Sequence, residues 1–286
     1  GLDGGNAMQR FFAGGWLFYA AVMVLMAAFL AASAIDLELW IIPIQICWFV
    51  AGVGLATSAA AGWLISPDII TAYELFPEVG VKTAAATLGA TAGAVISLLA
   101  LRLGWLPVSY ALDAAWEAEK AKNPDTPDPD YNHRLECLKE VLFLLPILIG
   151  AAAGLLIVRG DAGWNAVEKL MQIIFIKGLI GSLAGYFVGC ATVWGTRIFG
   201  TLAFGKEAMG LGDVHLMAAA GAVIGPFWVV LAFFIAPFFG IAWALYQAIF
   251  KKIRQIPYGP FLSAAVFVVI IFHDSIKQLI ANLYGF

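Results

Sequence analysis

Long apolar segments separated by short polar ones run through most of the chain. A helix needs about 20 apolar residues to cross a bilayer. By that measure the pattern predicts eight membrane segments, at 16–35, 44–65, 83–103, 141–158, 171–193, 214–225, 228–250 and 261–280. The sixth is too short to cross alone at about 1.5 Å per residue. We therefore expect it to be tilted or partly re-entrant, sharing its crossing with Pro226 and Phe227.

The composition agrees with a membrane protein. Of 286 residues, 62% are hydrophobic and only 12% are charged, whereas a soluble domain carries about 25% charged residues. We expect an all-α, polytopic transmembrane helix bundle that forms a single domain over residues 1–286. The net charge of -3 gives no indication of nucleic-acid binding. The cysteines have no metal-binding or redox spacing, so neither a metal nor a cofactor is expected. Two of them, Cys47 and Cys190, fall in apolar segments, and Cys137 falls in a polar loop.

The long polar stretch at 104–140 is predicted to be a hairpin between two membrane segments. Its centre, 123–130, is rich in proline and aspartate and predicts a loop. Residues 111–122 predict a short helix at the membrane interface. A charge-rich stretch of this kind is usually a solvated surface, so we favour that interpretation over a partner-binding role.

Two aspartates stand at the ends of apolar segments. Asp36 follows the first segment, and Asp213 precedes the sixth, directly after Gly210-Leu211-Gly212. Four complete segments lie between them, so both aspartates reach the same face of the membrane. Acidic side chains at this depth are costly, which makes the pair a candidate functional site.

Two neighbouring carboxylates have a well-defined chemistry. They share one proton, because both cannot easily be ionised at short range. One then acts as a base that activates water, and the other as an acid that polarises a scissile carbonyl. Gly210 and Gly212 would let a substrate strand approach the main chain, and Pro43 would open the second segment. The plainer alternatives are that Asp213 is a helix N-cap and that Asp36 is an ordinary interfacial acid.

The distribution of basic residues predicts which side the aspartates face. Their side would carry Arg102, Lys120, Lys122, Arg134, Lys139, Arg197, Lys206, Lys251, Lys252 and Arg254. The other side would carry Arg10, Lys82, Arg159, Lys169 and Lys277, and Lys177 falls inside the fifth segment. Because basic residues concentrate on the cytoplasmic side, the aspartates are expected to face the cytoplasm. In the fifth segment, Gly181, Gly185 and Gly189 recur every four residues, which predicts close helix packing.

The residues around both aspartates resemble a known family. Residues 34–43, AIDLELWIIP, resemble the first aspartate motif of the type IV prepilin peptidases. Residues 205–219, GKEAMGLGDVHLMAA, resemble their second motif. Residues 256–261, IPYGPF, resemble the Pro-Phe-Gly-Pro segment near the C-terminus of that family.

The resemblance implies a membrane aspartic endopeptidase of the Gly-x-Gly-Asp class. Such enzymes remove the short basic leader of prepilins or pseudopilins at the cytoplasmic face of the bacterial inner membrane. Asp36 and Asp213 would be the catalytic pair, and Gly210, Gly212, Glu207, Lys206 and Pro43 would bind substrate or support the site. For Glu207 and Lys206, an ion pair with each other or with Arg197 is an equally good expectation.

The chain also departs from the family pattern. Ile44 stands where the family has Asp or Asn, and His215 where it has Lys. The two Cys-x-x-Cys pairs that accompany N-methyltransferase activity in many members are not in this sequence, so we assign neither methylation nor zinc. Residues 81–170 look like an insertion of two membrane segments and one polar hairpin.

Two other functions remain open. One is a presenilin-like intramembrane aspartic protease, although that family has Tyr-Asp where this chain has Ile35-Asp36. The other is a non-enzymatic transporter whose acids bind ions or protons. Transporters often contain internal repeats, and the hydropathy pattern shows none.

Overall fold

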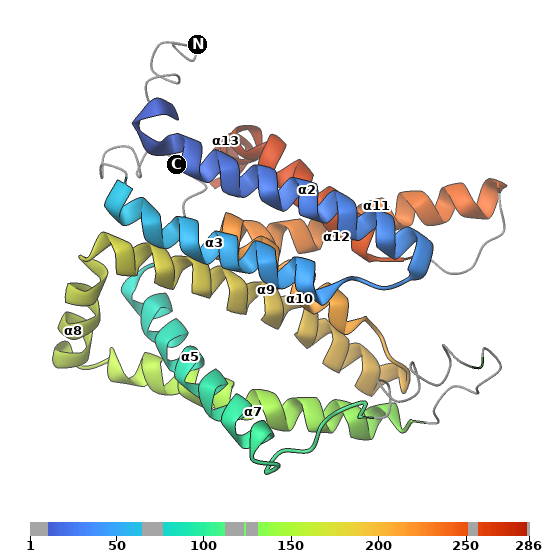
Figure 1. Cartoon of the computed structure of the whole chain (residues 1–286), viewed down its shortest axis with the longest axis horizontal. Helices are drawn as coiled ribbons and strands as arrows, with labels where there is room; N and C mark the ends of the chain where they lie inside the picture. The colour runs from blue at the N-terminus through green and yellow to red at the C-terminus, as the bar shows by residue number, and fades with distance from the viewer. Residues whose placement is uncertain (1–10, 65–76, 112–122, 124–130, 251–256, 285–286) are drawn as a thin grey trace.

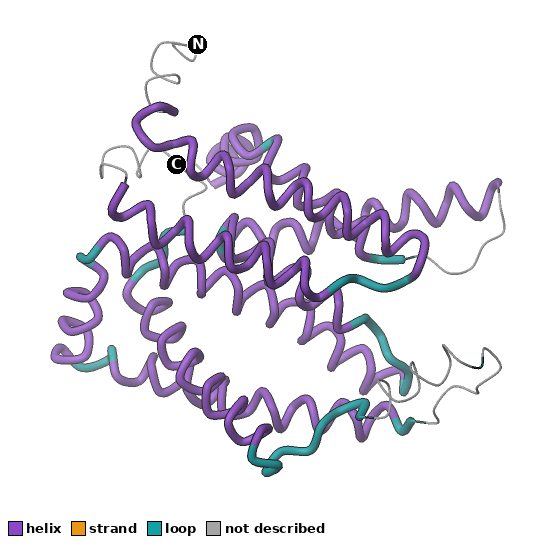
Figure 2. Tube along the Cα trace, viewed as in Figure 1, coloured by secondary structure: helices purple, strands orange, loops and turns teal. Residues whose placement is uncertain are grey.

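The computed structural model describes residues 11–64, 77–111, 123, 131–250 and 257–284. Over these ranges all regular structure is helical, which confirms the all-α prediction (Figure 1 and Figure 2). The helices are η1 (Phe11–Gly15), α2 (Trp16–Leu39), α3 (Ile44–Leu64), α5 (Val81–Arg102), α7 (His133–Ile157), α8 (Asp161–Met171), α9 (Ile174–Phe204), α10 (Leu211–Ile224), α11 (Pro226–Phe250), α12 (Gly259–Ile271) and α13 (His273–Tyr284).

Six of the described helices, α2, α3, α5, α7, α9 and α11, are long and apolar enough to cross a membrane. Counting the bent pair α12 and α13 as one span gives a seventh, and α10 is a shorter apolar helix. Each predicted segment therefore corresponds to a helix or a helix pair, and the sixth is short as expected. The chain is a multi-pass membrane protein.

The eighth predicted segment is not one straight helix. α12 and α13 are joined at an angle of 76°, with the break at Phe272. α13 begins with His273 and Asp274 and also carries Lys277, so it has a polar face that an apolar membrane interior does not favour. An amphipathic helix of this kind is better accommodated at an interface than across the bilayer.

The fourth predicted segment begins earlier than its hydropathy indicated. α7 begins at His133, and the Asn132 side chain caps it by accepting a hydrogen bond from the Leu135 amide at 3.3 Å. Residues 133–140 of the expected polar hairpin are thus helical. Cys137 lies on this helix and is buried, so its placement in a polar loop was wrong. The predicted helix at 111–122 and the loop at 123–130 fall almost wholly outside the described residues.

α10 forms the centre of the bundle. From Asp213 to Ile224 all its residues except His215 are buried, and it packs against α3, α9, α11 and α12. Glycines on the α9 surface make this possible. A β-carbon on Gly185 would collide with the carbonyl oxygen of Gly221, and one on Gly189 with that of Met217. The close packing predicted from the glycine repeat is confirmed.

The long helices alternate in direction between the two ends of the bundle. In Figure 1 the C-terminal end of α2, the N-terminal end of α3, the loop before α10 and the start of α12 all lie at the same end of the molecule. This arrangement agrees with the parity argument from hydropathy, and it places the two aspartate-bearing segments at one end.

Candidate active site

Asp36 lies in the last turns of α2 and is only 6% exposed. The helix ends just beyond it, at Trp40, which adopts a left-handed conformation and donates its amide to the Asp36 carbonyl at 3.0 Å. The side chain points toward the start of α12, where it accepts a backbone hydrogen bond from Gly259. A buried carboxylate needs such donors, because removal from water is otherwise costly.

Asp213 is the third residue of α10 and is also 6% exposed. Its carboxylate accepts a backbone hydrogen bond from Gly210, the N-cap residue of the helix. This is the return bond of a capping box, in which the third helical side chain bonds the N-cap amide. The N-cap is therefore Gly210, and the alternative that Asp213 serves as N-cap was wrong. The Oδ1 atom of Asp213 is buried and has no hydrogen-bond partner among the described residues.

The carboxylate of Asp36 is near enough to Asp213 for their negative charges to repel each other. Ile42, in the short connection after α2, lies between their supporting turns. A β-carbon on Gly212 would stand 2.8 Å from Cβ of Ile42, and one on Gly259 would stand 2.9 Å from Cδ1 of the same side chain. Glycines at both positions are needed for this close approach. Residues from α2, α10, α12 and the α2–α3 connection thus converge around the aspartate pair.

Pro43 directly precedes α3 and accepts a hydrogen bond from the Ile46 amide at 3.1 Å through its carbonyl oxygen. The prediction that Pro43 opens the second segment is confirmed. The contacts with the glycines are made by its neighbour Ile42.

Tyr258, at the N-cap of α12, is a further residue of this region. Burial raises the pKa of its phenol to about 12, and the negative charge of Asp213 adds to the effect. Its ring packs edge-on against Phe261. Neither Tyr258 nor Gly259 was predicted as a site residue, although both fall in the IPYGPF motif. That motif was the available signal.

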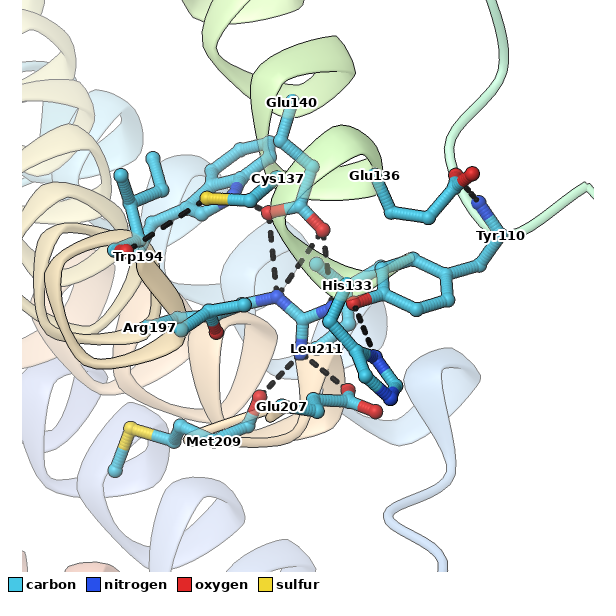
Figure 3. Close-up of polar contacts among 12 residues, drawn as sticks. Tyr110, His133, Glu136, Cys137, Glu140, Trp194, Arg197, Glu207, Met209 and Leu211 are labelled. Atoms are coloured by element: carbon cyan, nitrogen blue, oxygen red, sulfur yellow. Dashed lines mark hydrogen bonds and ion pairs between the residues drawn. The ribbon is translucent and has the colours of Figure 1, made fainter. Parts of the chain in front are cut away.

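Arg197 organises the loop that leads into α10 (Figure 3). The arginine is buried, and its guanidinium is paired with a carboxylate. Its Nε donates to Glu140 at 3.1 Å, and its Nη2 donates to the same carboxylate at 3.0 Å. The Nη1 atom donates to the Glu207 carboxylate and to the Met209 carbonyl oxygen. The expected ion pair between Glu207 and Arg197 is therefore present, whereas Lys206 is exposed.

Two aromatic residues complete the surroundings of this arginine. The Trp194 indole donates to Glu140 at 2.7 Å, and the Tyr110 ring covers the guanidinium at 5.3 Å from its centroid. Sequence reasoning counted Arg197 as a cytoplasmic charge and as a candidate partner of Glu207, and it placed Glu140 in a polar hairpin. Hydropathy contains no information on which helices are neighbours, so it gave no signal for this network.

Lys177 lies inside the fifth span, as predicted, but close to its start. α9 begins at Ile174, so Lys177 occupies the first turn of this helix. Its ammonium pairs with Glu78 at 2.9 Å, and both side chains are partly exposed. For metals, no group of three or more His, Cys, Asp or Glu residues with suitable placement occurs within the described ranges.

Comparison with known proteins assigns the segment that contains Asp213 and Arg197. Residues 138–245 match the sequence model of the type IV leader peptidase family; the match begins after Asp36. A prepilin leader peptidase/N-methyltransferase of Aeromonas hydrophila is 35% identical over 104 residues, which are 35% of this chain and 34% of that protein. One from Dichelobacter nodosus is 28% identical over 116 residues, 41% of this chain and 40% of that protein.

The aligned part thus spans only a third to two fifths of these relatives. No solved structure matches the chain significantly. The family match contains the second motif, at 205–219, whereas the motifs at 34–43 and 256–261 lie outside it. Residues 138–245 of this chain are therefore similar to the type IV leader peptidase family.

Proposed function

We propose that this protein is a membrane aspartic endopeptidase that removes the short basic leader of type IV prepilin or pseudopilin-like proteins. Asp36 and Asp213 are its catalytic pair. The observation that carries the proposal is the convergence of these two buried carboxylates from helices far apart in the sequence. The names of the relatives, which are prepilin leader peptidases, support the substrate class.

The reaction needs one proton shared by the pair. The ionised carboxylate removes a proton from a water molecule as the oxygen attacks the scissile carbonyl carbon, while the protonated carboxyl donates its proton to the carbonyl oxygen. Proton transfer to the departing amine then completes hydrolysis. The unpartnered Oδ1 of Asp213 offers an acceptor for this water, since a buried oxygen without a partner gains most from one.

The glycines around the pair supply room for an extended substrate. Exposed Gly210 carries no side chain, so a peptide backbone can approach the main chain there. Ile42 lies against Gly212, which supports the site through that contact. Lys206 and Glu207 lie on the exposed part of the same loop, where they support the substrate entrance. The proposed peptidase step uses no cofactor, and the peptidase activity is the one we assign to this chain.

The active site is proposed to face the cytoplasm of a bacterium, with the protein in its inner membrane. The support is the distribution of basic residues, with ten on the aspartate side and five on the other. A cysteine placed at exposed Lys206 should be protected from a membrane-impermeant maleimide in intact cells and labelled in inverted vesicles. Labelling in intact cells would reverse the orientation.

The central experiment is the replacement of each aspartate by asparagine. Asp36→Asn and Asp213→Asn should each abolish cleavage of a prepilin in detergent or vesicles, because neither amide acts as acid or base. Asp161→Asn is a matched control, since Asp161 is exposed at the start of α8. Normal cleavage by either site variant would overturn the assignment.

Mapping the cut site separates this proposal from its alternatives. Cleavage at a leader boundary supports a leader peptidase, whereas cleavage in the middle of a substrate span would indicate a presenilin-like protease. Solute flux driven by pH in vesicles, with no proteolysis, would indicate a transporter.

A further inference from the structure

We propose that Arg197 is a positioning residue that sets the orientation of the Asp213 carboxylate through a single peptide group. The inference deepens the proposed peptidase function and rests on it for its kinetic test. It concerns a residue that does not itself touch the substrate, and it makes the α5–α7 helix pair a support of the site.

The first step concerns the peptide bond between Met209 and Gly210. Its carbonyl oxygen accepts a hydrogen bond from Nη1 of Arg197. On its other side the Asp213 carboxylate lies against Gly210, where a β-carbon would stand 3.5 Å from Oδ2, and the Gly210 N–H donates to that carboxylate. Because the peptide group is planar and trans, fixing the carbonyl direction also fixes the N–H direction. Hydrogen bonds on the two sides of one amide also polarise each other and strengthen both. Arg197 therefore reaches the aspartate through one rigid unit.

The second step concerns what holds the arginine. Its Nε and Nη2 sides are held by Glu140, and both side chains are 4% exposed. Nη1 is then directed at Glu207 and the Met209 carbonyl. A planar guanidinium serves both sides simultaneously, whereas a lysine ammonium is a single point charge that cannot reproduce the fork.

The third step concerns the origin of the supporting groups. Glu140 belongs to α7, and Tyr110, whose ring covers the guanidinium, belongs to the segment after α5. The Tyr110 amide is in turn held by Glu136 at 2.7 Å, also on α7. In Figure 1 the α5–α7 pair extends away from the helices that carry the aspartates. This network ties that pair to the loop ahead of Asp213 at the aspartate end of α9.

A double substitution separates positioning from stability. Arg197→Met alone leaves Glu140 buried without its partner, which is strongly destabilising, whereas removal of both charges is often neutral. Arg197→Met with Glu140→Leu should therefore regain thermal stability. In this double variant the Met209 carbonyl still lacks its hydrogen-bond donor. We therefore expect kcat to fall about 100-fold, the effect of misplacing a reacting group by roughly 1 Å, whereas KM should change little. Arg197→Lys should not rescue kcat.

Exposed Arg102, at the end of α5, provides the control. Arg102→Met removes an arginine without touching the loop, so kcat should stay at the wild-type value. If the double variant regains kcat together with its stability, Arg197 is only a structural residue and the proposal is overturned.

Amide hydrogen exchange tests, independently of proteolysis, whether Arg197 holds the loop ahead of Asp213. In the double variant the amides of residues 206–212 should exchange at least about tenfold faster than in wild type, because the loop opens more often. The α9–α10 interface should exchange at its wild-type rate. Unchanged exchange at 206–212 would overturn the positioning role of Arg197, even if the wild-type enzyme is active. Absence of prepilin cleavage by the wild type would instead refute the proposed function. The exchange measurement would then still decide whether Arg197 holds the loop.

Discussion

Gly259 and Asp36 approach so closely that a β-carbon on Gly259 would stand 2.6 Å from Oδ2 of the aspartate. The backbone amide of the same glycine donates to that carboxylate. Gly259 therefore has two roles, one as a hydrogen-bond donor and one as the space in which the carboxylate lies. Any side chain at this position would have to displace the aspartate or Ile42.

The first prediction follows from this contact. Gly259→Ala should lower kcat for prepilin cleavage by about 100-fold, because a displacement of a reacting group by roughly 1 Å has an effect of that size. Steady-state kinetics in detergent micelles would measure it. Gly52→Ala is the matched control, since a β-carbon on Gly52 in α3 meets nothing within 4 Å. Equal activity of the two variants would contradict the close approach.

The second prediction concerns the packing of α9 on α10. Gly185→Ala should destabilise the protein by about 1–3 kcal/mol, the usual range for overpacking, because the new β-carbon collides with the Gly221 carbonyl oxygen. Gly195→Ala, on the same helix, places its β-carbon where nothing lies within 4 Å and should be neutral or stabilising by up to about 1 kcal/mol. Denaturant titration of the purified protein compares them, and a stable Gly185→Ala variant would refute the packing.

The third prediction concerns the ionisation of Tyr258. Burial and the charge of Asp213 raise its pKa to about 12, whereas a free tyrosine titrates near 10. The neutral phenol therefore stabilises the folded state fully below about pH 10, and this contribution is lost as pH rises from about 10 to 12.

The absorbance difference at 295 nm between wild type and Tyr258→Phe would test this prediction. At about pH 10.5 the folded proteins should show no tyrosinate difference, whereas after denaturation at the same pH the wild type should show the absorbance of one additional, mostly ionised tyrosine. A tyrosinate signal of that size in the folded wild type would mean that Tyr258 is solvated.

The fourth prediction contrasts two ion pairs. Lys177 and Glu78 form a partly exposed pair, so Lys177→Met should change stability by no more than about 1 kcal/mol. Arg197→Met breaks a buried pair and should destabilise by about 3–5 kcal/mol. Both values come from the same unfolding measurement. Comparable losses would show that burial does not distinguish these pairs.

Hydropathy alone predicted the helical class, the positions of seven segments and the shared end of Asp36 and Asp213. These features follow from local rules, because apolar length determines where a helix can span and the number of spans determines which face a residue reaches. Hydropathy failed at 261–280 and at the start of α7. There, polar residues such as Asp274 and Glu140 remain on helices, and average polarity does not distinguish a loop from a helix with buried polar partners.

The residues of the candidate site divide in the same way. The sequence by itself determined Asp36 and Asp213 as a candidate pair, together with the glycines beside Asp213. Motifs made this possible, since each motif is a short stretch of neighbouring residues. Only the tertiary structure decided that Gly259 lies against Asp36, that Ile42 fills the space between the two turns, and that Arg197 reaches the Gly210 peptide with Glu140 behind it. Those contacts join residues from different helices, and they depend on the rotation and packing of each helix, which the hydrophobic pattern of an all-apolar segment does not specify.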